Sequence, residues 1–207
     1  MRNKTLKYAL LLVSGFALSS PVWADENECP DDYDKARGTM LGNTCAGCHG
    51  TNGASVGPAT PIIGGLSVDT ITEAMNAYKS GDRPSTVMGR IAKGYTEEEI
   101  NAMAGFFCEQ KFVPAKQEAN AELAKAGQKL HDKFKCEKCH EEGGSVDEDG
   151  SSIIAGQWKT YLQYELADFQ EKHRGMPKKM KKAMKKLLKK DADANIEQII
   201  EYYISQQ

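Results

Sequence analysis

Apolar residues recur every three or four positions along most of the chain, which is the spacing of one face of an α-helix. The clearest stripes occupy 68–78, 100–107, 157–169 and 196–203. No segment of useful length alternates apolar and polar residues as a half-buried strand does. The pattern therefore predicts an all-α protein.

Several residues mark where these helices begin and end. Asp32 is placed to cap a helix that starts at Tyr33. Thr96 and Glu99 have the spacing of a capping box at the start of the stripe 100–107, and Gly81 follows the stripe 68–78 as a helix stop.

The order of the elements repeats. Each half offers a helix, a Gly-rich loop, a middle helix, a Met-bearing loop and a closing helix, and the stretch 112–116 interrupts helicity between them. We predict two tandem domains, 25–112 and 118–207, joined by a linker at 113–117. Domains of this size bury little core of their own.

The first 24 residues have the features of an export signal. Three bases precede an apolar run at 8–18, and Val22 and Ala24 stand at the −3 and −1 positions of a cut after Ala24. The run is shorter than the roughly 20 residues that a membrane span needs. We expect 1–24 to be a cleaved signal peptide, and the exported chain to have no stable membrane insertion.

Charge excludes one class of function and raises a question about partners. The chain has 27 Lys and Arg against 29 Asp and Glu, and loss of 1–24 would leave 24 against 29. A net charge of −5 argues against a general nucleic-acid binder. Residues 172–190, however, hold ten Lys or Arg and no acid. This basic run has two interpretations, a solvated helix face and a docking surface for an acidic partner protein.

The chemistry lies in two copies of one motif, Cys45-Ala-Gly-Cys48-His49 and Cys136-Glu-Lys-Cys139-His140, which are 91 residues apart. Cys-x-x-Cys-His is the signature of covalent c-type haem attachment. Two cysteines on one helical turn can form thioethers with one porphyrin, and the next residue then presents an imidazole to the iron. We predict two covalently bound haem c groups, with His49 and His140 as proximal ligands.

Two other chemistries can use four cysteines in such pairs. A structural zinc site would leave the histidine after each second cysteine unexplained, and the separation of the pairs far exceeds the usual zinc spacing. Thioredoxin-like chemistry needs a βαβ scaffold, for which the sequence shows no strands.

The sixth ligand of each iron is expected to be a methionine. Met88 stands in an irregular loop just before a capped helix, whereas Met75 and Met103 fall on helical stripes and Met40 on a leading helix, so those three are expected to pack. Met180 lies 92 residues after Met88, close to the motif offset, and is favoured for the second haem. Met176 is the alternative, and His173 would give bis-His ligation.

Three further expectations concern groups around these sites. Pro58 is expected to accept a hydrogen bond from His49, since a proximal histidine usually donates its other ring proton to a carbonyl. Trp158 and Tyr161 either bond a haem propionate or simply pack. The two remaining cysteines, Cys29 and Cys108, flank the terminal helices of the first domain, and we expect them to form a disulfide.

Beyond the motifs, stretches spread over nearly the whole mature chain carry a specific likeness. They are Asn43-Thr-Cys-Ala-Gly-Cys-His-Gly50, Ser85-Thr-Val-Met-Gly-Arg-Ile-Ala-Lys-Gly-Tyr95, Lys129-Leu-His-Asp132, Ala155-Gly-Gln-Trp158, Tyr161-Leu-Gln-Tyr164, Met176-Pro-Lys-Lys-Met180 and Ser205-Gln-Gln207. In these stretches the chain resembles the dihaem cytochrome c subunit of flavocytochrome c sulfide dehydrogenase.

The resemblance implies two tandem class I cytochrome c domains, each around one covalently attached haem. It implies a periplasmic subunit that accepts electrons from an FAD-containing sulfide dehydrogenase subunit and passes them to a soluble cytochrome c. By the family's motif, His49 and Met88 would ligate one iron and His140 and Met180 the other. The pair Cys29 and Cys108 departs from the family pattern, as does the weight of the basic run.

Other functions remain open from the sequence. A free-standing dihaem cytochrome c carrying electrons to a terminal oxidase is the main alternative. A peroxidase is disfavoured because both halves offer a methionine and no cluster of polar catalytic groups recurs. The chain has no Gly-x-Gly-x-x-Gly flavin fingerprint after a strand, so it is not expected to be an enzyme on its own.

Overall fold

The structure of the chain is a computed structural model that describes residues 29–147 and 151–206. The expected signal peptide, 1–24, lies outside the described residues. Within the described ranges, no helix is both long enough and apolar enough to cross a membrane.

The described residues fold into helices joined by turns, with no β-strand among their elements. Residues 29–112, here called the N-terminal half, hold α1 (Lys35–Thr44), α2 (Ala46–His49), α3 (Val68–Ser80), α4 (Met88–Ile91) and α5 (Glu97–Cys108), with 3-10 turns at Thr51–Gly53 and Ala92–Gly94. The C-terminal half, 113–206, holds α6 (Ala121–Phe134), a 3-10 turn at Cys136–Lys138, α7 (Lys159–Gln170), α8 (Lys178–Leu187) and α9 (Ala192–Ile204). The predicted all-α fold is confirmed.

Local signals set most of the helix ends. The Thr96 hydroxyl accepts from the Glu99 N–H, and the Glu99 carboxylate accepts from the Thr96 N–H, so the capping box is present. Gly81 ends α3 with φ of 90°, a left-handed conformation that glycine adopts without strain. The predicted N-cap of the first helix, Asp32, is wrong by two residues. The side chain of Asp34 caps α1 by accepting a hydrogen bond from the Arg37 N–H.

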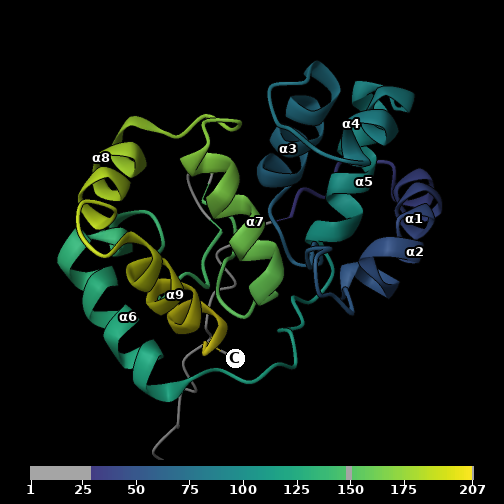
Figure 1. Cartoon of the computed structure of the whole chain (residues 1–207). Coiled ribbons are helices and arrows are strands. Elements are labelled where there is room, and N and C mark those ends of the chain that lie inside the picture. The colour runs from purple at the N-terminus through teal and green to yellow at the C-terminus, as the bar shows by residue number, and fades with distance from the viewer. Residues whose placement is uncertain (1–28, 148–150, 207) are drawn as a thin grey trace, which may run out of the picture.

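Each half is built on one close helix pair. In Figure 1, α1, α3, α4 and α5 gather on one side and α6, α8 and α9 on the other, with α7 between them. A Cβ added to Gly38 would lie 2.4 Å from the Ala102 carbonyl oxygen, and one added to Gly127 would lie 1.9 Å from that of Gln198. Glycine therefore permits the α1–α5 and α6–α9 contacts, which close each half.

A disulfide completes the N-terminal half. Cys29, ahead of α1, is bonded to Cys108, the last residue of α5, as the sequence led us to expect. The bond ties the start of the described chain to the end of the closing helix.

The two halves are joined by buried hydrogen bonds as well as by the linker. Gln157 is only 2% exposed, and its side chain accepts from the Ile62 N–H at 3.1 Å and donates to the Ile62 carbonyl at 2.7 Å. The neighbouring Trp158 donates its indole N–H to the Ser55 carbonyl at 3.1 Å. The indole therefore bonds the other half in this structure, an outcome that neither of our interpretations of Trp158 included.

Charged groups extend the same interface. The buried carboxylate of Asp147 accepts from the N–H and hydroxyl of Ser67 and from the hydroxyl of Thr70, at 2.6 to 3.0 Å, at the start of α3. Arg83, after α3, pairs with Glu165 of α7 at 2.6 Å, and both side chains are mostly buried. Arg83 also donates to the hydroxyl of Tyr161 at 3.3 Å. Each half thus satisfies polar groups of the other.

Candidate functional site

The first motif forms one helical turn at the junction of α1 and α2. Cys45 ends α1 and caps α2, and its carbonyl accepts from the N–H groups of Cys48 and His49 at 3.1 and 2.9 Å. Cys45 is half-buried and Cys48 is exposed, and neither is part of a disulfide. Two thiols and an imidazole therefore project from a single turn.

The second motif reaches the same arrangement by a different route. Lys135 takes a left-handed conformation with φ of 61° and ends α6, so the motif begins as a separate 3-10 turn. The Cys136 carbonyl again accepts from the residues three and four positions later, Cys139 at 3.2 Å and His140 at 2.9 Å. Cys136 is half-buried and Cys139 exposed, as in the first half.

Burial keeps the inner thiols protonated. It raises the pKa of Cys45, and it raises the pKa of Cys136 to about 11. In the part of the chain that the structure describes, no three His, Cys, Asp or Glu side chains are grouped to hold a metal ion.

His49 is oriented by a backbone carbonyl. Its Nδ1 lies 3.0 Å from the Pro61 oxygen, and burial lowers the pKa of the imidazole, which is thus neutral. A neutral ring that donates from Nδ1 leaves the Nε2 lone pair free for a metal. The prediction that the Pro58 carbonyl accepts this hydrogen bond is wrong. Ser55 bonds both Gly57 and Thr60 and folds that loop back, which leaves Pro58 exposed and brings Pro61 to the ring.

His140 has the same position in its motif but not the same support. Its Nδ1 is buried and has no hydrogen-bond partner. Burial, with the nearby His131, lowers the pKa of His140 to about 4, so this ring is also neutral. The ring of Tyr203 packs edge-on against it at 6.2 Å between centroids. The two imidazoles therefore differ in one hydrogen bond.

The donor set in each half fits a covalently attached haem. Two thiols one turn apart can add to the two vinyl groups, and a neutral imidazole follows directly on the same turn.

The methionines occupy less regular positions. Met88 is the first residue of the short α4, where the Gly89 N–H donates to the Ser85 hydroxyl at 2.6 Å and tightens the turn. Met180 lies in α8 and Met176 in the turn before it, and all three are partly exposed. The imidazole of His173 is 57% exposed and faces Asp168 and Glu171.

The other methionines are divided. Met103 is buried in α5, and Met75 packs against the core of the N-terminal half, as expected. Met40 was expected to pack but is 64% exposed on α1.

Three buried polar residues were not singled out from the sequence. Gln157 and Asp147 join the halves, and His131 lies 3.1 Å from the Tyr203 hydroxyl through Nδ1. No local pattern marks any of them, because their partners lie 72 to 95 residues away.

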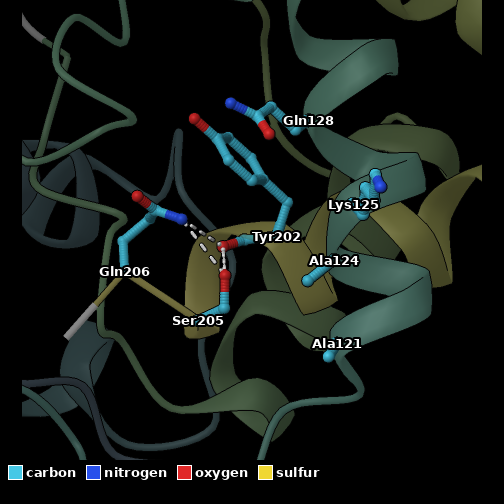
Figure 2. A pocket seen from close by; sticks show the side chains of 7 residues that line it. All are labelled: Ala121, Ala124, Lys125, Gln128, Tyr202, Ser205 and Gln206. Carbon is cyan, nitrogen blue, oxygen red and sulfur yellow. Dashed lines mark hydrogen bonds between the residues drawn. The ribbon is translucent and has the colours of Figure 1, made fainter.

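A cavity of about 300 Å³ lies between α6 and the end of α9. Figure 2 shows its lining, with the Gln206 amide donating to the Tyr202 carbonyl and to the Ser205 hydroxyl. The lining residues are Ala121, Ala124, Lys125, Gln128, Tyr202, Ser205 and Gln206. None belongs to a Cys-x-x-Cys-His motif or is an expected iron ligand.

Comparisons with known proteins agree with this chemistry. Over 100 residues the chain is 45% identical to the cytochrome subunit of sulfide dehydrogenase from Chlorobaculum tepidum, a match that covers 47% of this chain and 87% of that protein. It is 27% identical to cytochrome c4 from Pseudomonas aeruginosa over 147 residues, which covers 68% of this chain and 73% of the relative. No family model matches.

A solved structure shares the fold. Reduced recombinant cytochrome c4 from Pseudomonas stutzeri superposes with a TM-score of 0.71 at 23% identity. The match covers 84% of this chain and 100% of that one, so the likeness extends over both halves.

Proposed function

The chain belongs to the family of the cytochrome subunit of sulfide dehydrogenase, with the all-α fold of tandem class I cytochrome c domains, and we propose that it is a periplasmic dihaem electron-transfer subunit. Its relatives are cytochromes, which supports electron transfer through covalently bound haem c. In the proposal, electrons come from an FAD-containing sulfide dehydrogenase subunit and leave to a soluble cytochrome c.

One observation carries the proposal of two haems. The same turn of two thiols and a neutral imidazole occurs once in each half, although the two turns differ in helix type. In our assignment Cys45 and Cys48 bind one haem and Cys136 and Cys139 the other.

The remaining ligands follow from the same assignment. His49 and His140 would each ligate one iron, and Met88 and Met180 would each supply the second protein ligand of an iron. When bound, the haem iron supplies reversible one-electron chemistry. The chain's own part is to bind and orient the group and to surround it with apolar side chains.

The domain bounds and the export of the chain to the periplasm are part of this proposal. We assign a cleaved signal peptide to 1–24, cytochrome domains to 25–112 and 118–207, and a linker to 113–117. The hydrogen bonds of Gln157 and Trp158 support a fixed arrangement of the two domains.

The subunit would not oxidise sulfide alone. That step removes electrons in pairs, and a flavin can pass them on singly to a haem. The sequence carries no flavin-binding fingerprint, so FAD is assigned only to the partner. The complex, and not this chain, would be the sulfide:cytochrome c oxidoreductase.

A free-standing carrier that feeds a terminal oxidase is the second candidate. The match to cytochrome c4 spans 68% of this chain, whereas the match to the sulfide dehydrogenase subunit spans 47%. The longer alignment is thus to a relative whose name does not describe it as a subunit, which supports the second candidate.

The test is to isolate the tagged mature chain anaerobically from its own cells and to quantify haem and flavin per chain. We expect two haems, a bound flavoprotein, and reduction of the haems by sulfide only when that partner is present. A haem-free chain would refute the proposal. Two haems without flavin, together with direct reduction of an oxidase, would establish the free-standing carrier instead.

Variants of the same chain locate the ligands. Cys45→Ala with Cys48→Ala should leave one haem, as should Cys136→Ala with Cys139→Ala. Met180→Ala should abolish the thioether charge-transfer band of one haem, while Met176→Ala keeps it. The reverse result would move the distal ligand to Met176.

A further inference from the structure

The most uneven charge distribution on the molecule is on and after α8. Eight lysines lie within residues 178–190, and we call them the lysine face: Lys178, Lys179, Lys181, Lys182, Lys185, Lys186, Lys189 and Lys190. All eight are exposed. Among the described residues none of them forms an ion pair, so their charges are available to another molecule.

The fold directs these lysines to solvent. Leu187 is 3% exposed and anchors α8, which contacts α6 and α9. The Asn195 side chain donates to the Leu187 and Lys190 carbonyls, both at 2.7 Å, and holds the end of the helix on the protein. The lysine face is therefore a fixed surface and not a loose tail. In Figure 1, α8 lies on the side of the molecule opposite α1 and α2.

The rest of the chain has the opposite charge. Beyond residue 24 the net charge is −5, and residues 172–190 contribute ten positive charges without an acid, so the remainder carries −15. Such a separation creates a field that orients the molecule as it approaches a charged partner. A partner with an acidic surface is attracted to α8 and repelled by the other faces.

The position of α8 connects this surface to the chemistry. Met180, the proposed distal ligand, lies in the middle of the lysine face. The corresponding short helix of the N-terminal half, α4, carries only Arg90, with Lys93 just after it. The basic surface is thus specific to the second site.

A membrane fits this surface poorly. A helix that lies on a bilayer inserts large apolar side chains as well as placing lysines at the headgroups. The exposed large hydrophobic residues of the described chain are Met40, Val56, Val87, Ile91, Val113 and Tyr164, and none is on α8.

We propose that the lysine face is the docking surface for a soluble redox protein with an acidic surface, and that electrons leave this chain from the C-terminal site. The proposal rests on the proposed function, whose soluble acceptor it describes chemically. The step moves one electron: the acceptor is reduced as this chain is oxidised, and no bond forms or breaks.

The experiment measures how fast the reduced chain reduces a c-type cytochrome of net negative charge. The intact holoprotein is reduced by a flash-generated free flavin semiquinone, so the sulfide-oxidising partner is not needed. The test variant is Lys178→Gln, Lys182→Gln and Lys186→Gln, three lysines spaced by four on α8. Its matched control is Lys125→Gln, Lys129→Gln and Lys133→Gln, exposed lysines with the same spacing on α6.

At low ionic strength we expect the α8 variant to lose at least tenfold in second-order rate and the α6 variant less than twofold. The wild-type rate should fall steeply with added salt, because the Debye length shortens, and the α8 variant should lose most of that dependence. A cytochrome of net positive charge should not react more slowly with the α8 variant than with the wild type, because the variant has lost only groups that repel it. Haem absorbance spectra that are unchanged in both variants would show that the sites are intact.

Each of the other possible outcomes would refute a specific part of the proposal. Equal rates for the α8 and α6 variants would refute the docking surface while leaving electron transfer in place. A wild-type chain that reduces neither cytochrome would contradict the proposed function itself. If α8 lysines control binding to phosphatidylglycerol vesicles and leave the rate unchanged, the surface binds membranes and the proposal is wrong.

Discussion

One of the links between the two halves depends on a single side chain, that of Gln157. Gln157 satisfies both the N–H and the carbonyl of Ile62, and Ile62 is fully buried, so water has no access to replace the lost partner. Gln157→Ala would leave two buried backbone groups without hydrogen bonds. Each such group costs about 1–3 kcal/mol. We therefore expect the variant to lose about 3 kcal/mol of unfolding free energy.

Urea denaturation of the holoprotein measures this loss. With a slope of about 3 kcal/mol per M, the midpoint should fall by about 1 M. Far-ultraviolet circular dichroism follows the helices, and haem absorbance follows the sites. Because the lost bonds link the halves, the two signals should separate in the variant and coincide in the wild type.

An exposed glutamine on the adjoining helix provides the control. Gln163→Ala on α7 changes the same side chain where it is exposed, and should move the midpoint by less than 0.2 M, roughly the effect of an ordinary surface substitution. If Gln157→Ala and Gln163→Ala unfold at the same urea concentration, the interface bonds contribute no net stability and our reasoning is refuted.

Three further predictions concern the disulfide, acid stability and the two potentials. C29S/C108S should destabilise the chain by about 4 kcal/mol, because the bond closes a loop of 79 residues in the unfolded state; equal thermal midpoints would contradict this. Burial lowers the pKa of His131, so the unfolded chain takes up a proton first and stability should fall between pH 7 and pH 5, less so in His131→Gln; a pH-independent urea midpoint would exclude this. His49 donates to a carbonyl and His140 has no partner, so potentiometry of the single-haem variants should give the lower potential at the His49 site, and the reverse order would count against the assignment.

The parts of the structure that sequence reasoning predicted are those with local causes. The capping box of Thr96, the helix stop at Gly81 and the two Cys-x-x-Cys-His turns each depend on residues within four positions of one another. The disulfide could be predicted because only two cysteines lie outside the two motifs.

The features that the sequence did not predict depend on contacts between residues far apart in the chain or on the path of a loop. Whether Pro58 or Pro61 faces His49 depends on how Ser55 folds the intervening loop, which the spacing alone does not determine. The role of Gln157 depends on a partner 95 positions away, and a glutamine in a Gly-rich turn carries no sign of burial.

The loop at 55–62 is shared by two different interactions. Its Pro61 carbonyl orients the imidazole of His49. In the same loop, Ile62 is hydrogen-bonded to Gln157, and Ser55 is hydrogen-bonded to Trp158, both from the other half. A shift of α7 would therefore move the backbone segment whose Pro61 carbonyl orients the His49 ring. We therefore expect a partner that binds near α7 to change the surroundings of His49, the proposed iron ligand in the N-terminal half, through this loop.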